Sequence, residues 1–218
     1  MKGRIPVYVE VTPKRTFAGA VEWPGWCRSG KTVDAALEAL VAYADRYGKV
    51  VSPSRLGFKP PSGVEDLEVV ERLKGNATTE FGAPGAPPKA DDRRLSAAEL
   101  KRQATILEAS WRAFDRVAKG AVRVTLTKGP RGGGRDLPKM VDHVTGAEES
   151  YLAALGSRRP ADAGAQRKTI QAALAARAQD KPLADPNNVK KPWSPRFFVR
   201  RAAWHVLDHA WEIEDRSS

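Results

Sequence analysis

The first part of the chain carries hydrophobic patterns that are typical of β-strands. Residues 7–12 alternate valine with polar or tyrosine side chains, and this period of two predicts a half-buried strand. The turn residues 13–15 (Pro-Lys-Arg) lead into a second predicted strand over residues 16–21, so we expect a hairpin. The run 23–26 (Trp-Pro-Gly-Trp) predicts a further turn.

A helix is predicted after this hairpin. Thr32 can cap its first turn, and apolar residues follow at helical spacing over residues 36–44. Gly48 lies where this helix is expected to end. Beyond it, residues 67–71 (LEVVE) predict one short strand and residues 78–81 (TTEF) another.

A linker follows. Residues 82–88 (GAPGAPP) contain no apolar side chain larger than alanine or proline, so they predict an extended, exposed segment. We therefore expect three parts. These are a small α+β domain with β-β-α-β order over residues 1–81, a linker over residues 82–94, and a helical domain over residues 95–218.

Four amphipathic helices are predicted in the helical part. The first begins at a capping box, residues 96–99 (SAAE), and the second begins at Asp136. The third covers residues 165–179, and the fourth begins at the cap and proline of residues 194–195 and continues to Arg216. The sequence as a whole therefore predicts an α+β protein whose second half is an antiparallel four-helix bundle.

Composition removes several classes of protein. No run of about 18 apolar residues occurs, which argues against a membrane-spanning helix. The N-terminal residues lead into a strand pattern rather than an apolar signal core, so we expect a cytoplasmic protein. The single cysteine, Cys27, excludes a disulfide framework and a thiolate zinc cluster. We expect Cys27 to pack in the core.

The chain is basic, with 37 Lys and Arg against 26 Asp and Glu and a formal net charge of +11. This balance invites a nucleic-acid-binding interpretation. The basic residues are interspersed with acids, however, and no run of five like charges occurs. We favour a general basic bias, and expect any nucleic-acid binding to be weak, independent of sequence and sensitive to salt.

The three histidines of the chain all lie in the helical part. His205 and His209 are four residues apart, so their rings project from one face of the last helix. His143 lies on the second predicted helix among apolar neighbours. Three imidazoles from two neighbouring helices can bind one divalent ion and leave positions open for water or substrate. The alternative is three separate histidines, each satisfied in the core or at the surface.

Two segments resemble one known family. Residues 131–148 (RGGGRDLPKMVDHVTGAE) and residues 203–211 (AWHVLDHAW) are similar to the DinB/YfiT-like four-helix-bundle superfamily. The resemblance implies that His143, His205 and His209 bind a divalent metal ion such as nickel, zinc, iron or cobalt.

The resemblance covers residues 95–216. It also implies kinship with thiol-dependent S-transferases and isomerases and with the metal-binding domains of thiol-histidine oxidases. The chain departs from the family in the loop before the second helix, where Arg131 or Arg135 stands in place of a common aromatic residue.

Acidic residues near the histidines are candidates for catalysis. Glu212 is seven residues after His205, so both lie on the same face of the predicted last helix. Glu212 is therefore a candidate to orient a ligand or to act as a base. Asp208 is a weaker candidate. Glu148 is expected to pair with the basic last helix. The alternative for these acids is a solvated position at a helix end.

A glycine-rich loop leads into the second helix. Residues 128–136 (KGPRGGGRD) contain Lys128, Arg131 and Arg135. Arginine side chains and backbone donors at a helix start can hold a carboxylate or phosphate. These three cations are therefore candidates to bind the substrate. The alternative is a connection with ordinary surface charge.

The N-terminal part resembles a second family. Residues 17–37 (FAGAVEWPGWCRSGKTVDAAL) are similar to the HicB-like fold, in which a strand, a Pro-Gly turn and a Gly-x-Thr helix start follow one another. No DNA-binding segment of the usual kind accompanies it, so an antitoxin role is not favoured. Trp23 and Trp26 are expected either in the core of this domain or over the mouth of the bundle.

Two kinds of function remain open at this point. The first is a metal-dependent enzyme, a transferase, lyase or hydrolase, that acts on a small molecule such as a low-molecular-weight thiol. The second is a regulatory or binding protein, with a nucleic-acid or protein partner, whose metal is not catalytic or whose bundle holds no metal. Either function is compatible with a homodimer.

Overall fold

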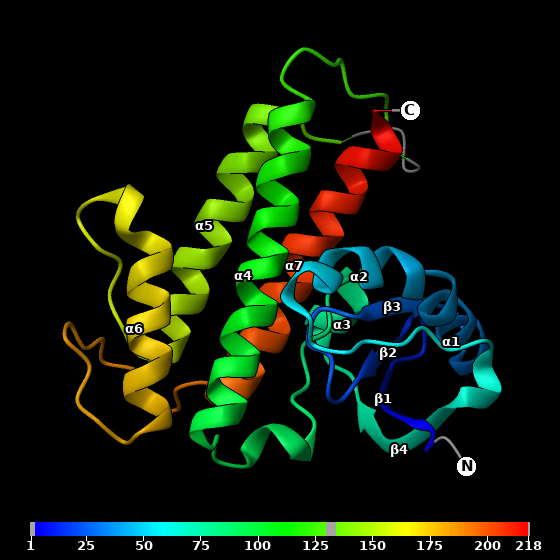
Figure 1. The fold of residues 1–218 in the computed structure, drawn as a ribbon, viewed down its shortest axis with the longest axis horizontal. Coiled ribbons are helices and arrows are strands. Elements are labelled where there is room, and N and C mark those ends of the chain that lie inside the picture. The colour runs from blue at the N-terminus through cyan, green and yellow to red at the C-terminus, as the bar shows by residue number, and fades with distance from the viewer. Residues whose placement is uncertain (1–2, 130–133, 218) are drawn as a thin grey trace.

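The protein has an α+β fold in the computed structural model, which describes residues 3–129 and 134–217 (Figure 1). The described part contains a four-stranded mixed sheet and seven α-helices. The first half of the chain supplies β1 (Ile5–Val11), β2 (Thr16–Ala20), β3 (Cys27–Gly30), α1 (Val33–Ala42), α2 (Ala44–Val51), β4 (Leu67–Lys74) and α3 (Ala77–Phe81). The second half supplies α4 (Ala97–Gly120), α5 (Leu137–Leu155), α6 (Gln166–Ala178) and α7 (Pro195–Arg216).

The predicted hairpin is confirmed. β1 pairs antiparallel with β2, with Val7 opposite Ala20 and Val11 opposite Thr16. The strand order in the sheet is β3-β2-β1-β4, and β4 pairs with β1 in parallel. Because β1 lies in the middle of the sheet, it is buried along most of its length.

Two predictions about local structure in the first half are wrong. The helix after Thr32 does not run on to Gly48, because it breaks at Tyr43 and a second helix, α2, contains Gly48 in its interior. Residues 78–81 are not a strand but part of α3. The side chain of Asn76 accepts hydrogen bonds from the backbone N–H groups of Thr78 and Thr79, and this cap outweighs the strand preference of two threonines.

The segment predicted as an exposed linker is packed against the sheet. Pro84 and Pro88 are buried, and the backbone N–H of Gly85 donates to the Glu10 carboxylate at 2.9 Å. The hydroxyl of Thr79 donates to the same carboxylate. A buried carboxylate needs such donors, so the segment serves to satisfy Glu10 and is not the exposed segment that its composition predicts.

The helix starts predicted for the second half are confirmed. Ser96 caps α4 in a capping box with Glu99, Asp136 caps α5 and Ser194 caps α7. In each case the side-chain oxygen accepts a backbone N–H of the first turn, which otherwise has no partner within the helix.

Helix α7 is the central element of the molecule. It lies between α4 and α5 on one side and the sheet with its helices on the other (Figure 1). Phe198 and Val206 belong to the apolar core shared with α4, α5 and α6. Leu207 and Trp211 belong to the core shared with the sheet, α1 and α2. Seventeen of the 22 residues of α7 are therefore buried.

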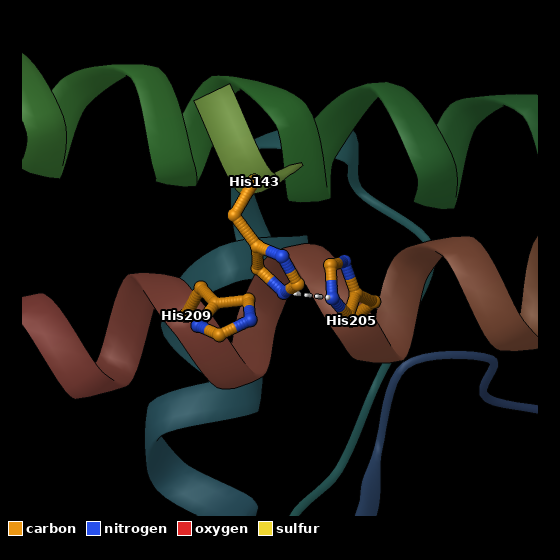
Figure 2. Close-up of side chains that lie close together, drawn as sticks. All are labelled: His143, His205 and His209. Atoms are coloured by element: carbon orange, nitrogen blue, oxygen red, sulfur yellow. Dashed lines mark hydrogen bonds between the residues drawn. The ribbon is translucent and has the colours of Figure 1, made fainter. Parts of the chain in front are cut away.

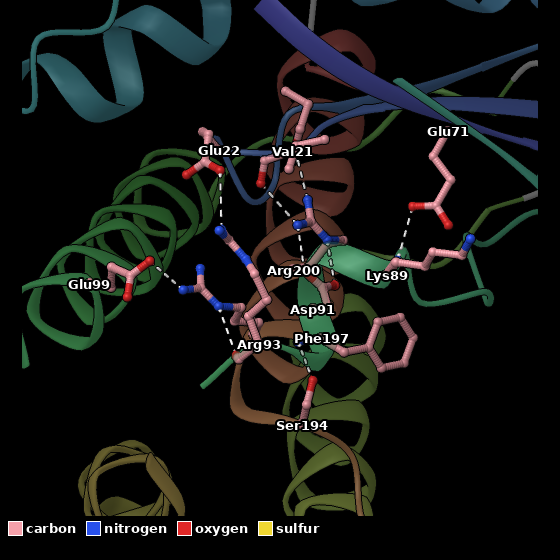
Figure 3. A network of polar contacts seen from close by, with 12 residues as sticks. Val21, Glu22, Glu71, Lys89, Asp91, Arg93, Glu99, Ser194, Phe197 and Arg200 are labelled. Atoms are coloured by element: carbon pink, nitrogen blue, oxygen red, sulfur yellow. Dashed lines mark hydrogen bonds and ion pairs between the residues drawn. The ribbon is translucent and has the colours of Figure 1, made fainter. Parts of the chain in front are cut away.

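Arg200 on α7 holds the two halves together (Figure 3). Its Nε and Nη2 atoms donate to the two carboxylate oxygens of Asp91, each at 2.7 Å. Its Nη1 and Nη2 atoms also donate to the carbonyl oxygens of Ala20 and Val21, at 2.8 and 2.9 Å. Arg200 is 5% exposed and Asp91 is 1% exposed, so this is a buried, bidentate ion pair at the end of a strand.

The two tryptophans of the first half pack in the core of the sheet and its helices, which is one of the two positions expected for them. Trp26 is fully buried, and its indole Nε1 donates to the carbonyl oxygen of Leu40 at 2.9 Å. Trp23 packs its ring edge-on against Tyr47 and Phe58. Cys27 is buried as expected, and its burial raises the pKa of the thiol to about 12.

Candidate metal centre

The three histidines come together where α5 packs against α7 (Figure 2). His205 and His209 lie one turn apart on α7, with ring centroids 4.6 Å apart. His143 projects from α5 toward both, with ring centroids 5.0 Å from His205 and 4.9 Å from His209. The placement follows from helix periodicity, because residues four apart share one face.

The ring nitrogens have a spacing that one ion can bridge. One nitrogen from each of His143, His205 and His209 lies within 4.8 Å of the other two. The Nε2 atoms of His143 and His205 are 3.1 Å apart. Two nitrogens bound tetrahedrally at usual zinc distances lie about 3.3 Å apart. The His143–His205 pair already has nearly this separation, and the third ring is close enough to join the same ion.

The surroundings keep the imidazoles in the form that binds metals. Burial, together with the neighbouring His209 and Arg201, lowers the pKa of His205 to about 2. Burial also lowers the pKa of His143. Both rings are therefore neutral at neutral pH, as metal ligation requires. Among the described residues, Nδ1 of His205 is buried with no hydrogen-bond partner.

Glu212 orients one of these rings. Its Oε2 atom lies 2.9 Å from Nδ1 of His209, and its Oε1 atom accepts a hydrogen bond from Nη1 of Arg216 at 2.9 Å. The hydrogen bond with His209 is the main reason that the pKa of Glu212 is lowered. Because Glu212 occupies Nδ1, the ring presents Nε2 to the other histidines, an arrangement common in metal sites.

The other two candidate acids have different surroundings. Asp208 forms an ion pair with Arg28, with 2.8 Å between Oδ1 and Nη1.

The expected pairing of Glu148 with the last helix is wrong. Glu148 is buried, and its Oε2 atom lies 3.6 Å from Nε of Arg167 on α6. Burial raises the pKa of Glu148. Helix α5 also packs against α6, and this packing brings Arg167 within reach of Glu148.

The histidines line a cavity of about 730 Å³. Its wall includes residues of both halves of the chain, among them Phe17 and Tyr43 from the first half and Tyr151, Trp204 and Asp208 from the second. A cavity of this size is in the range of small-molecule sites. The cavity therefore has room for a small molecule beside the histidines.

Of the predicted cations of the glycine-rich loop, the structure brings Arg135 to the histidine cavity but not Lys128. Arg135 lines the histidine cavity. Lys128 instead lines a neighbouring cavity of about 1170 Å³ at the end of α4 and α5, to which Arg135 also contributes. Arg131 lies outside the described residues.

One basic residue at the site was missed by the sequence analysis. Arg201 lines the cavity with the histidines and is 8% exposed. Its signal was present in the sequence, because positions 201, 205 and 209 follow one another at a spacing of four on one helix face.

Comparisons with known proteins add no relative. No family model, no curated protein and no solved structure matches the chain. Among the described residues, no helix is both long enough and apolar enough to cross a membrane.

Proposed function

We propose that the chain binds one divalent metal ion through His143, His205 and His209 and uses it in a reaction on a small molecule. The observation that carries this proposal is the gathering of one nitrogen from each ring within 4.8 Å on the wall of a cavity. In the described part of the chain, no other cluster of three histidine, cysteine or acidic side chains has this spacing.

The resemblance to DinB/YfiT-like proteins supports the same proposal and refines it. On this proposal α4, α5, α6 and α7 form a DinB-like four-helix bundle, and the first half is a HicB-like domain. The ion is nickel, zinc, iron or cobalt, all of which imidazole ligands suit. The substrate is a low-molecular-weight thiol or a molecule that reacts with one.

Each residue near the ion has a proposed part in the reaction. When bound, such an ion supplies a positive centre that stabilises a thiolate or hydroxide at neutral pH. Glu212 holds His209 in the tautomer that presents Nε2. Asp208 lies on the cavity wall, fixed by Arg28, and is the acid that we propose as acceptor of the proton from a thiol or water.

The test is metal analysis of protein purified without a histidine tag from metal-replete cells. We expect one ion per chain, and we expect His205→Ala to lose it. An ion that binds only the native state stabilises it. Added metal should therefore raise the melting temperature of the wild type but leave that of His205→Ala unchanged.

The matched control is Glu214→Ala, a change on the same helix at a residue that pairs with Arg46. This variant should keep its ion. A wild-type protein that contains no metal and takes up none on titration with zinc, nickel, cobalt and ferrous iron would disprove the proposal.

A further inference from the structure

Arg201 carries a buried charge for which the described residues supply no counter-ion. It lies on α7 one turn before His205, and its guanidinium lies 5.1 Å from the ring centroid of Tyr151 and 4.7 Å from that of Trp204. Its Nη1 atom is buried with no hydrogen-bond partner, and no carboxylate of the described residues lies within ion-pair distance. Charges buried in this way are rare unless something pairs with them.

The acids on the cavity wall are all engaged elsewhere. Asp208 pairs with Arg28, Asp215 pairs with Arg46, and Glu212 contacts His209 and Arg216. None of the three is paired with Arg201. The positive charge of Arg201 is therefore available to a ligand.

Two more arginines of the cavity wall lack an ion-pair partner among the described residues. Arg15 and Arg135 line the same cavity, and neither forms an ion pair with any described carboxylate. The Nε atom of Arg15 is buried and also has no hydrogen-bond partner in the described ranges. The cavity thus has an excess of positive charge in its wall, which favours an anionic ligand.

The position of Arg201 places such a ligand beside the histidines. Tyr151, whose ring lies under the guanidinium of Arg201, also contacts His205 edge-on, with 5.7 Å between ring centroids. Trp204 contacts His205 at 6.2 Å. The two aromatic rings hold the guanidinium in place, so that little side-chain freedom is lost when it binds an oxyanion.

We propose that Arg201 binds an oxyanion group, a carboxylate or a phosphate, of the small molecule on which the histidine site acts. This inference rests on the proposed function for the neighbouring metal, but the anion site itself is built from Arg201, Tyr151 and Trp204. It differs from the sequence-based expectation, which placed the anion on the glycine-rich loop. Arg15 and Arg135 are available for a second acidic group.

The test uses metal-free protein, so that a failure of the metal site does not affect it. Thermal unfolding and tryptophan fluorescence are followed while succinate or inorganic phosphate is added at constant ionic strength set with chloride. We expect saturable stabilisation by at least one of the two anions, and the anion that binds more tightly identifies the group as a carboxylate or a phosphate.

Arg201→Met keeps much of the side-chain volume and removes the charge. We expect its affinity for that anion to fall about ten- to hundredfold, the loss typical of a hydrogen bond to a charged group. Its melting temperature without anion should be equal to that of the wild type or higher, since an unpaired buried charge is removed. A purely structural arginine would instead lower the melting temperature when replaced.

Two controls separate this inference from the proposed function. Arg112→Met removes one charge from an exposed position on α4 and should bind the anion as the wild type does. His205→Ala should lose metal but keep the stabilisation by anion. If wild type and Arg201→Met respond equally to both anions, or if neither anion binds the wild type, the inference is wrong even where metal binds.

Discussion

Glu212 contacts His209 across a single helical turn, with 2.9 Å between Oε2 of the carboxylate and Nδ1 of the ring. The other carboxylate oxygen of Glu212 is held by Arg216. The chain Arg216–Glu212–His209 thus fixes the direction in which one of the three imidazoles points. This orientation is set by residues of one helix and does not require the ion.

This relationship makes a prediction about metal affinity. Glu212→Ala frees the ring of His209 to rotate, so we expect the affinity for zinc to fall about 10- to 100-fold, as for other residues that orient a ligand. The measurement is a competition titration with a chromophoric chelator. Glu214→Ala on the same helix is the control, and equal affinities for the two variants would show that Glu212 does not orient a ligand.

Stability of the metal-free protein should depend on pH through His205. Its pKa of about 2 in the folded protein lies below its ordinary value of 6.5, so between these values the unfolded chain binds a proton that the folded chain does not. The free energy of unfolding should therefore fall as the pH falls below about 6.5, and His205 should contribute about 1.4 kcal/mol per pH unit to this fall. Above about pH 6.5, the contribution of His205 should not change with pH.

Urea unfolding of chelator-treated protein between pH 7.5 and pH 5 measures this slope. His205→Leu removes the titrating group, so the slope of this variant over the same pH range should be smaller. Identical slopes for the two proteins would mean that His205 is not held neutral by burial.

The ion pair between Arg200 and Asp91 makes a prediction about stability. Asp91→Ala leaves the buried Arg200 guanidinium without its carboxylate, so the free energy of unfolding should fall by about 3–5 kcal/mol. Asp185→Ala removes the partner of Arg158 in an exposed ion pair and should cost less than about 1 kcal/mol. Chemical denaturation measures both, and similar small losses would show that the buried pair contributes little.

Features that depend on neighbours in the sequence were predictable. The caps Ser96, Asp136 and Ser194 act on N–H groups three residues away, so their pattern is complete within one turn of helix. The spacing of His205 and His209 is also local. His143 joins them only through the packing of α5 on α7, which the resemblance implied but no local pattern shows.

Features that depend on distant partners were not predictable in the same way. The segment containing Pro84 was expected to be exposed, because nothing near it in the sequence indicates that Glu10 needs its backbone. The pairing of Glu148 with Arg167 depends on which helix α5 faces. That Arg201 lacks a carboxylate partner is likewise a property of the whole cavity wall.

The central place of α7 has a consequence for how the chain folds during synthesis. Both apolar cores include residues of α7, and two of the three clustered histidines are on it, yet every other helix and strand precedes it in the chain. Until α7 has left the ribosome, the earlier elements expose the apolar surfaces that it later covers. Neither half nor the histidine cluster is therefore complete until this one helix has packed.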